Sequence, residues 1–353
     1  MNDKTGRPIR VWALLGPHRG DNNQILALAE ALELGFEEKP LNFNQLRRLQ
    51  PALLGASFAS LDSASRRLLE GEPPDLTIST GHRSVPAVLE LKRRSGGRMH
   101  AVHLGYPRIA PRHFDLVVPT PEYPITDAPN VLRIPFALSP HSPPAVVSPA
   151  EQSKFDALPQ PRRLFVVGGP TLYWQLPTDT MRAAVSRLLA DSRNDGGSLL
   201  LVSSPRTPAP LIEALESELR PSTLPILIVP ASGPPSYRSM LEAADMIFVT
   251  ADSVAMVADS VMTRKPVGIV PIEKSALGRV ATALNDTVRR GKRLFPRDLR
   301  FFWEALKEQG FGGTIAAPRA SNPPDYSAMV AERVRQLLAQ PAQPATGDRD
   351  NGQ

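Results

Sequence analysis

The sequence contains no cysteine among its 353 residues. This absence excludes disulfides, thiolate zinc sites, iron–sulfur clusters and a cysteine nucleophile. No apolar run approaches the roughly 20 residues that cross a bilayer. The start at Met1 also lacks the charged-then-apolar layout of a signal peptide. We therefore expect a cytoplasmic protein whose chemistry rests on oxygen, nitrogen and backbone groups.

Aromatic residues are scarce as well, at 6%, and no motif interleaves them with basic residues. This disfavours nucleic acid as a partner. Basic residues nevertheless cluster, between His82 and His113 and again between Arg289 and Arg300. Such clusters attract anionic sugar phosphates or anionic lipid, although solvated helix faces are the plainer interpretation. The weakly amphipathic segment Leu53–Leu69 could likewise touch the inner face of a membrane, or it could pack into a core.

Proline, by contrast, is abundant: 38 residues, about twice the ordinary usage. Many of them stand between two stretches that each suffice for a domain. Proline fixes φ and removes hydrogen-bond donors, so this middle stretch indicates a stiff, extended linker. We therefore divide the chain into a first domain at 1–139, a linker at 140–161, a second domain at 162–340 and a polar, disordered tail at 341–353.

Short β-rich runs alternate with helical periodicity in both domains. The expected strands are Ile9–Leu15, Asp75–Thr80, His100–Leu104, Asp115–Val118, Arg163–Val167, Ser198–Val202, Pro225–Val229, Met246–Thr250 and Val267–Val270. The expected helices are Asn22–Leu34, Ser84–Arg94, Thr178–Asp191, Pro208–Leu219, Tyr237–Ala244 and Ser253–Met262. Repeated strand, glycine turn and helix predict an α/β fold: two doubly wound domains with parallel sheets.

A polar turn joins the expected strand Met246–Thr250 to the helix that follows it. Thr250, Asp252 and Ser253 lie in this turn. The unpaired N–H groups at a helix start favour an anion, above all a phosphate. Asp259 falls two turns into the helix, where its carboxylate could accept hydrogen bonds from ribose hydroxyls. A plain helix cap followed by a solvated aspartate is the alternative.

Two further loops of the second domain follow strands in the same way. Gly168 and Gly169 allow a close approach of the backbone to a ligand, and Thr171 adds a hydroxyl. Arg206 follows the next strand and offers a cation to a diphosphate. Either loop could owe its residues to turn geometry or to ordinary surface. Open α/β sheets, however, bind ligands at the carboxyl ends of their strands, so together the loops predict a nucleotide-diphosphate site.

In the first domain, the turn after the first strand is dense in hydrogen-bonding side chains. Asp21 could be a general base, or it could cap the helix expected from Asn22. Asn22, Asn23 and Gln24 would then contact an acceptor molecule.

The loop after the strand Asp75–Thr80 should lie on the same rim of the first domain. It carries His82 as a second catalytic candidate, with Arg83 and Ser84 as further acceptor contacts. A merely solvated histidine is the alternative for His82. His100 and His103 face opposite sides of a strand because their offset is odd. No histidine pair has metal-ligand spacing, so we expect no metal.

Four of these motifs, in order between Val11 and Ile272, resemble the mitochondrial fission Elm family, which has plant members acting in mitochondrial division and many bacterial members. The motifs are Gly20-Asp21-Asn22-Asn23-Gln24, Ser79-Thr80-Gly81-His82-Arg83-Ser84, Val167-Gly168-Gly169-Pro170 and Thr250-Ala251-Asp252-Ser253-Val254-Ala255-Met256-Val257. More distantly, Pro74–Ala87 and Asp245–Pro271 are similar to the acceptor and donor regions of GT-B glycosyltransferases of the MurG family.

The resemblance implies a GT-B fold, with two facing Rossmann-like domains, an interdomain cleft and a C-terminal helix able to return to the first domain. It puts Asp259 where the MurG family has a ribose-binding glutamate, and Asp21 where that family has a histidine base. The implied activity is transfer of a sugar from a nucleotide-diphosphate sugar, as substrate and without a cofactor, to an anionic, lipid-linked or polysaccharide acceptor of the cell envelope. A nucleotide-sugar epimerase and a non-catalytic adaptor with an unknown protein partner are the alternatives.

Overall fold

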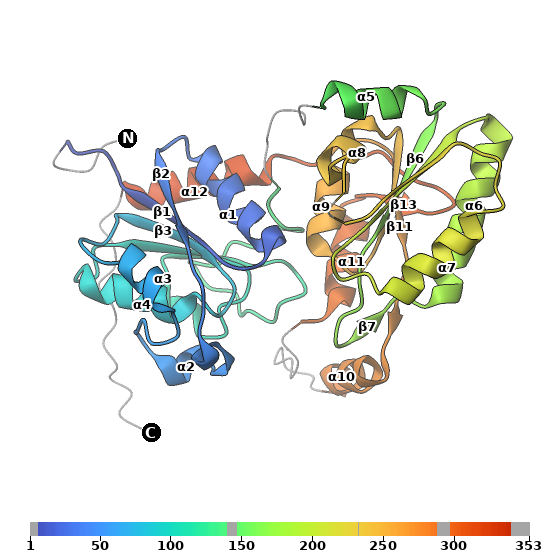
Figure 1. The fold of residues 1–353 in the computed structure, drawn as a ribbon. Helices are drawn as coiled ribbons and strands as arrows, with labels where there is room; N and C mark the ends of the chain where they lie inside the picture. Colours follow the sequence, from blue (N-terminus) through green and yellow to red (C-terminus); the bar gives the residue numbers. More distant parts are fainter. Residues whose placement is uncertain (1–5, 140–146, 232, 288–296, 340–353) are drawn as a thin grey trace. The chain divides into compact units, whose positions relative to one another are not determined.

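The computed structural model describes residues 6–139, 147–231, 233–287 and 297–339. The chain divides into two compact units. Unit 1 comprises residues up to 141 together with those from 325 onward, and unit 2 comprises residues 142–324. Each unit is built around its own parallel sheet (Figure 1).

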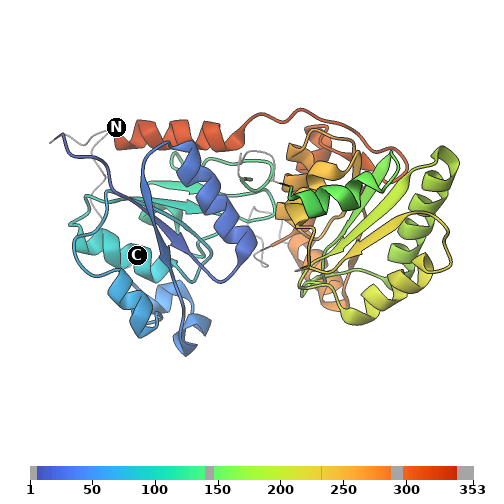
Figure 2. The same ribbon diagram turned by 45° about the horizontal axis from the view of Figure 1, so that its top comes forward.

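Unit 1 holds a five-stranded sheet in the order β2-β1-β3-β4-β5. Its strands are β1 (Val11–Leu15), β2 (Phe36–Pro40), β3 (Leu76–Thr80), β4 (His100–Leu104) and β5 (Leu116–Val118), and all neighbours are parallel. Helices α1 (Arg19–Ala31) and α12 (Tyr326–Leu338) pack side by side on one face. Helix α4 (Val85–Arg94) lies on the other face, beside α2 (Pro51–Leu54) and α3 (Ser63–Leu68) (Figure 2).

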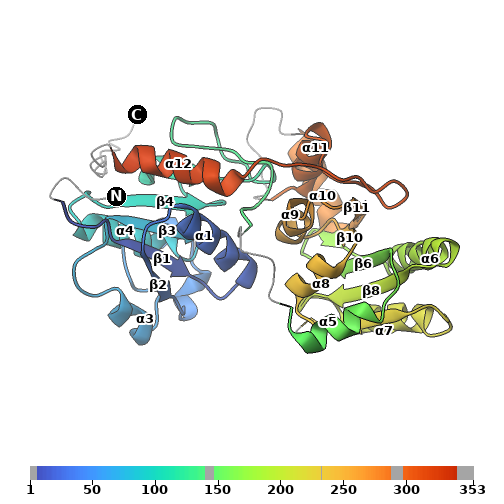
Figure 3. The ribbon, with the colours of Figure 1, turned by 90° about the horizontal axis from the view of Figure 1, so that it is seen from above.

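Unit 2 holds a six-stranded parallel sheet in the order β13-β11-β10-β6-β8-β9. Its strands are β6 (Arg162–Val167), β8 (Ser198–Ser203), β9 (Ile226–Val229), β10 (Met246–Thr250), β11 (Val267–Val270) and β13 (Gly313–Thr314). Its helices are α5 (Pro149–Asp156), α6 (Thr178–Asp195), α7 (Ala209–Leu219), α8 (Tyr237–Ala243), α9 (Val254–Met262), α10 (Ala276–Thr287) and α11 (Leu299–Glu308). The short strands β7 (Trp174–Gln175) and β12 (Glu273–Lys274) pair antiparallel beside this sheet. Helices α6 and α7 pack together on one side of the sheet, and α8 and α9 lie on the other (Figure 3).

Each strand order contains one point where the chain reverses its direction of growth across the sheet. In unit 1 that point lies between β1 and β3, and in unit 2 it lies between β6 and β10. The connections before and after such a point run over opposite faces, which leaves a crevice at the carboxyl ends of the two strands. The topology therefore directs attention to the loops after β1 and β3 and to those after β6 and β10.

Two expected boundaries differ from the structure, and the first concerns the C-terminal helix. Helix α12 belongs to unit 1, so the second unit ends at 324 and not at 340. The buried stripe of α12, which includes Val330 and Val334, lies on unit 1, and Arg335 donates to the carbonyl of Ala31 at 2.7 Å. A helix with one apolar stripe joins the surface that can bury it, as the family resemblance implied for this helix.

The second difference lies in the expected linker. Residues Pro149–Asp156 form helix α5, with a capping box between Ser148 and Glu151 and with Pro149 in the first turn. Proline at that position is compatible with a helix because its missing N–H would have had no partner there. Part of the expected extended linker is therefore helical, while residues 140–146 and the expected tail at 341–353 lie outside the described residues.

Among the residues that the structure describes, none of the helices combines the length and the apolar character that a membrane span requires.

Candidate functional site

Three loops that the sequence singles out meet at one edge of the unit 2 sheet. They follow β6, β8 and β10, and β6 lies between the other two strands. Because these strands are parallel, their carboxyl ends lie at the same edge. The loops are therefore neighbours in space, as the sequence analysis predicts.

The buried carboxylate of Asp252, which is 1% exposed, connects these loops. It accepts hydrogen bonds from the Gly169 N–H at 3.0 Å, from the Thr250 hydroxyl at 2.7 Å and from the Arg206 guanidinium at 3.1 Å. The Thr250 hydroxyl in turn accepts from the Gly168 N–H at 2.8 Å. We call Gly168, Gly169, Arg206, Thr250 and Asp252 the Asp252 cluster.

The two glycines of the cluster are required by neighbouring protein atoms. A Cβ at Gly168 would overlap the Asp252 carboxylate, and a Cβ at Gly169 would overlap the backbone carbonyl of Arg206. The close approach predicted at these positions thus occurs, but protein groups make it. The glycines are therefore required for the assembly of the cluster, and their contact with a ligand stays a prediction.

Two kinds of donor remain available at this edge. Ser253 is the N-cap of α9 and accepts from the Met256 N–H, whereas the N–H groups of Val254 and Ala255 begin the helix without intrahelical partners. The Arg206 side chain is 48% exposed, and its bonds to Asp252 and to the Gly169 carbonyl fix its direction. Helix N–H groups beside a fixed guanidinium form an arrangement that binds phosphate oxygens.

The remaining candidates of unit 2, Thr171 and Asp259, are not part of the Asp252 cluster. Thr171 closes a turn, since its hydroxyl accepts from the Trp174 N–H at 3.2 Å. Asp259 lies on α9. Burial raises the pKa of the Tyr237 hydroxyl on α8, and the negative charge of Asp259 raises that pKa further. Asp259 stands six residues after Ser253 along α9.

Sequence reasoning missed two residues that support this edge. The Thr207 hydroxyl donates to the Gly168 carbonyl at 2.7 Å, and it stands in a loop that the sequence analysis already considers. Trp303 of α11 donates from its indole N–H to the Ala251 carbonyl at 3.0 Å and packs edge-on against Trp174. No local pattern links Trp303 to a loop about fifty residues earlier, although a rare tryptophan in an amphipathic helix could have drawn attention.

At the unit 1 edge, the turn after β1 is held by Asn22. Its side-chain amide accepts from the Gly16 N–H at 2.8 Å and donates to the Gly16 carbonyl at 2.9 Å. Helix α1 begins earlier than expected, at Arg19, with His18 as its N-cap. Asp21 therefore lies within the first turn and does not cap the helix.

The neighbouring side chains after Asn22 are not used in this way. Asn23 and Gln24 are half-buried. Within the described part of the chain, neither side chain makes a hydrogen bond to another residue. The expected acceptor contacts thus separate into one residue that holds the turn and two whose polar groups remain available.

The loop after β3 divides similarly. The Ser84 hydroxyl donates to the carbonyls of Thr80 and Gly81, both at 2.9 Å, so Ser84 closes the turn. Burial, and then the charges of Arg108 and Arg83, lower the pKa of His82 to about 4. His82 is therefore neutral at pH 7 and lies beside two guanidinium groups at the carboxyl edge.

Several residues of the basic clusters form ion pairs within the protein. In the first, Lys92 binds Asp115 at 2.7 Å, and Arg93 and Arg94 bind Glu90. In the second, Arg300 binds the carboxylates of Asp286 and Asp298, whereas Arg289–Arg293 lie outside the described residues. These ion pairs favour the plainer interpretation for the residues that make them. Arg83 and Arg108 are two of the cations at the unit 1 edge, and both act on His82.

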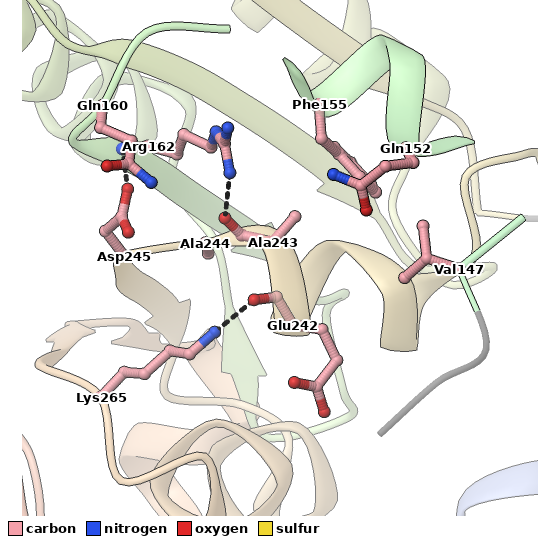
Figure 4. Close-up of a pocket in the computed structure, with 10 residues that line it drawn as sticks. All are labelled: Val147, Gln152, Phe155, Gln160, Arg162, Glu242, Ala243, Ala244, Asp245 and Lys265. Carbon is pink, nitrogen blue, oxygen red and sulfur yellow. Dashed lines mark hydrogen bonds between the residues drawn. The ribbon is translucent and has the colours of Figure 1, made fainter. Parts of the chain in front are cut away.

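Two hollows, one in each unit, lie away from both edges. The hollow of unit 2 has a volume of about 390 Å³ and is lined by residues that begin strands or precede them, such as Arg162, Asp245 and Lys265 (Figure 4). It therefore lies at the amino end of the sheet. Asp245 accepts there from the Arg162 N–H at 2.7 Å, so its carboxylate serves the fold. The hollow of unit 1, about 420 Å³, lies beside Phe58 and Arg94.

Among the described residues, no group of three or more histidine, aspartate or glutamate side chains is arranged so that it could hold a metal ion. Metal-independent chemistry stays a prediction.

The two parallel-sheet units define an α/β protein of the GT-B type, and solved structures share the fold. UDP-GlcNAc 2-epimerase from Methanocaldococcus jannaschii matches with a TM-score of 0.52 at 12% identity, over 94% of this chain and 100% of that chain. The spinosyn forosaminyltransferase SpnP matches with a TM-score of 0.50 at 13% identity, over 94% and 100%. MurG from Acinetobacter baumannii matches at 0.44, too low a score to relate individual residues. The expected fold class is confirmed.

The particular family follows from the sequence itself. The model described as mitochondrial fission ELM1 matches residues 19–338, so the chain belongs to that family, as predicted. The mitochondrial fission protein ELM1 of Arabidopsis thaliana is 24% identical over 246 residues. That match covers 62% of this chain and 56% of the plant protein, so the chain aligns with little more than half the length of this relative.

Proposed function

We propose that the chain binds a nucleotide-diphosphate sugar at the Asp252 cluster and transfers the sugar to an acceptor bound by unit 1. The observation that carries this proposal is the position of the cluster. A buried carboxylate fixes Arg206 at the carboxyl end of β6 and β10, where the strand order reverses, and the first N–H groups of α9 lie in the same loop. The fold shared with a sugar transferase and a nucleotide-sugar epimerase supports the same ligand class.

In this reaction the bond between the sugar C1 and the β-phosphate oxygen breaks, and a bond between C1 and an acceptor oxygen forms. Negative charge develops on the departing diphosphate. Fixed donors stabilise such charge without reorganisation, and here they would be the N–H groups of Val254 and Ala255 and the guanidinium of Arg206. Asp259 would accept hydrogen bonds from the ribose hydroxyls.

The acceptor hydroxyl must lose its proton to a base on unit 1. Asp21 in the first turn of α1 and His82 after β3 are the two candidates, and they follow adjacent strands. His82 is neutral at pH 7 and so has a free nitrogen for a proton. An anionic acceptor beside Arg83 and Arg108 would offset their charges and raise the pKa of His82 toward its ordinary value.

Calorimetry with UDP, GDP, CDP and ADP, each free and as sugar conjugates, tests the proposal. We expect one base to bind and Arg206→Ala to weaken that binding roughly tenfold. Arg193→Ala, an exposed arginine on α6, serves as the matched control and should bind like wild type. No binding of any nucleotide at millimolar concentration would contradict the proposal, and unchanged turnover in Asp21→Ala would exclude Asp21 as the base.

A non-catalytic adaptor is the second candidate, and one observation favours it. Asn22, Ser84 and Thr250 all use their polar groups to hold turns, which leaves fewer groups for chemistry. The name of the plant relative, a mitochondrial fission protein, also suits this role. Capture of a stable stoichiometric partner that Asp21→Ala and Asp252→Asn leave unaffected would favour the adaptor. Conversion of the nucleotide sugar to its epimer without an acceptor would identify an epimerase instead.

A further inference from the structure

Three exposed leucines stand within eight residues of one another on unit 1, in the segment that follows β2. Leu46 lies in the short 3₁₀ helix Gln45–Arg48, Leu49 directly follows that helix, and Leu53 lies in α2. Their exposed fractions are 41%, 43% and 76%. Single exposed leucines are ordinary, but here three of them stand in one segment of eight residues; we call them the exposed leucines. Helix α2 lies at an outer edge of unit 1 (Figure 1).

The same segment is basic. Arg47 and Arg48 stand between the leucines and are exposed, and so are Arg66 and Arg67 of α3. Asp62 is the only acidic residue from 44 to 69, and its carboxylate accepts from the Ser65 N–H at 2.7 Å as the N-cap of α3. Arg66 donates to the carbonyls of Ala59 and Leu61. The cations that stand directly among the exposed leucines are therefore Arg47 and Arg48.

The protein holds this segment in place from behind. The Asn44 side chain accepts from the Leu46 N–H and donates to the carbonyls of Ala59 and Leu61. These hydrogen bonds fix the start of the segment. The leucines are therefore exposed in a loop that is held in place and that cannot rotate to bury them.

We propose that the segment Gln45–Leu54 docks unit 1 on the surface of a bilayer that contains anionic lipids. Leucines of this kind enter the boundary between headgroups and acyl chains, while the arginines contact lipid phosphates. A second copy of the chain is a poor partner for this segment, because a symmetric contact would bring the positively charged arginines of the two copies together. The proposal does not depend on the proposed function.

Flotation of the full chain with vesicles tests the docking. We expect binding to vesicles of phosphatidylcholine with one-third phosphatidylglycerol, much weaker binding to phosphatidylcholine alone, and a loss when salt rises from about 0.1 M to about 1 M. Replacing both Arg47 and Arg48 by alanine should weaken binding roughly 25-fold, about fivefold for each arginine. Leu53→Glu should weaken it about tenfold or more.

Leu172→Glu is the matched control, since Leu172 of unit 2 is 66% exposed and should not affect the docking. Circular dichroism of each variant establishes that it is folded. The proposal is overturned if wild type ignores anionic vesicles, or if folded Leu53→Glu floats like wild type. It is equally overturned if wild type fails to float and light scattering shows a dimer that Leu53→Glu dissociates. In that case the segment would bind a second copy of the chain and not a bilayer.

Discussion

The two units carry their polar loops at corresponding topological positions but stabilise them in different ways. In unit 2 a single buried carboxylate, Asp252, ties the loops after β6, β8 and β10 together. In unit 1 each loop is closed separately, by Asn22 after β1 and by Ser84 after β3. The unit 2 edge is therefore one connected network, whereas the unit 1 edge consists of independent turns.

This difference suits the two kinds of ligand in the proposed function. The diphosphate is the same in every nucleotide-diphosphate sugar, and fixed backbone donors bind it best. An acceptor varies, and side chains such as His82 and Arg83 on separately closed turns can change without disturbing the fold. Substitutions that affect one unit and spare the other test whether the contrast holds.

The largest effect is expected for Asp252→Ala. The change leaves the buried Gly169 N–H and the Thr250 hydroxyl without their acceptor and Arg206 without its counter-charge, so unit 2 should lose about 4 kcal/mol of unfolding free energy. Urea denaturation followed by the fluorescence of Trp174 and Trp303 measures this loss. Asp191→Ala, which breaks only a surface pair with Arg187, should change little. A loss of similar size in both variants would mean that Asp252 does not organise the edge.

A second effect, in unit 1, depends on pH. Burial lowers the pKa of His103 to about 3, while the unfolded chain takes up the same proton near 6.5. As the pH falls below 6.5 the unfolded state therefore binds the proton first, and unit 1 should lose about 3 kcal/mol from this group by about pH 4. Unfolding followed by hydrogen exchange over β4 measures the loss. His103→Leu should remove that part of the slope, and His18→Leu, on the surface, should keep it.

The smallest effect compares the glycines that follow the first strand of each unit. Gly168→Ala forces a methyl group onto the Asp252 carboxylate and should cost about 2 kcal/mol. A Cβ at Gly16 meets nothing within 4 Å, so Gly16→Ala should cost about 0.5 kcal/mol or less. Thermal melts of the two variants give the comparison. Equal costs would show that the connected network of unit 2 is no tighter than the separate turns of unit 1.

The sequence predicts the buried strands well. The expected strands at 75–80, 163–167 and 246–250 agree with β3, β6 and β10 to within a residue, because continuous apolar runs and glycine turns are local signals. The exposed edge strand β2, with the sequence Phe-Glu-Glu-Lys-Pro, was not predicted, since its pairing with β1 alone makes it a strand. Helix α5 was also missed, because its prolines were interpreted as linker residues.

The candidate site could be predicted as a set of loops but not as a set of contacts. Gly168, Gly169, Arg206 and Asp252 were named from their positions after strands, and the structure brings them together. The structure adds that a Cβ at either glycine would overlap protein atoms, which no local pattern of residues specifies. Nothing in the sequence near Asn22 or Thr250 distinguishes a side chain that closes a turn from one that faces a ligand.

The sequence by itself therefore determined the parallel α/β class, the family and the loops that follow the strands, because apolar periodicity and turn residues act over a few neighbouring residues. The tertiary structure alone decided which carboxylate meets which loop. Gly169 and Asp252 are 83 residues apart and touch because β6 and β10 are neighbours in the sheet. Strand order is a property of the whole packed unit, and so are the contacts that depend on it.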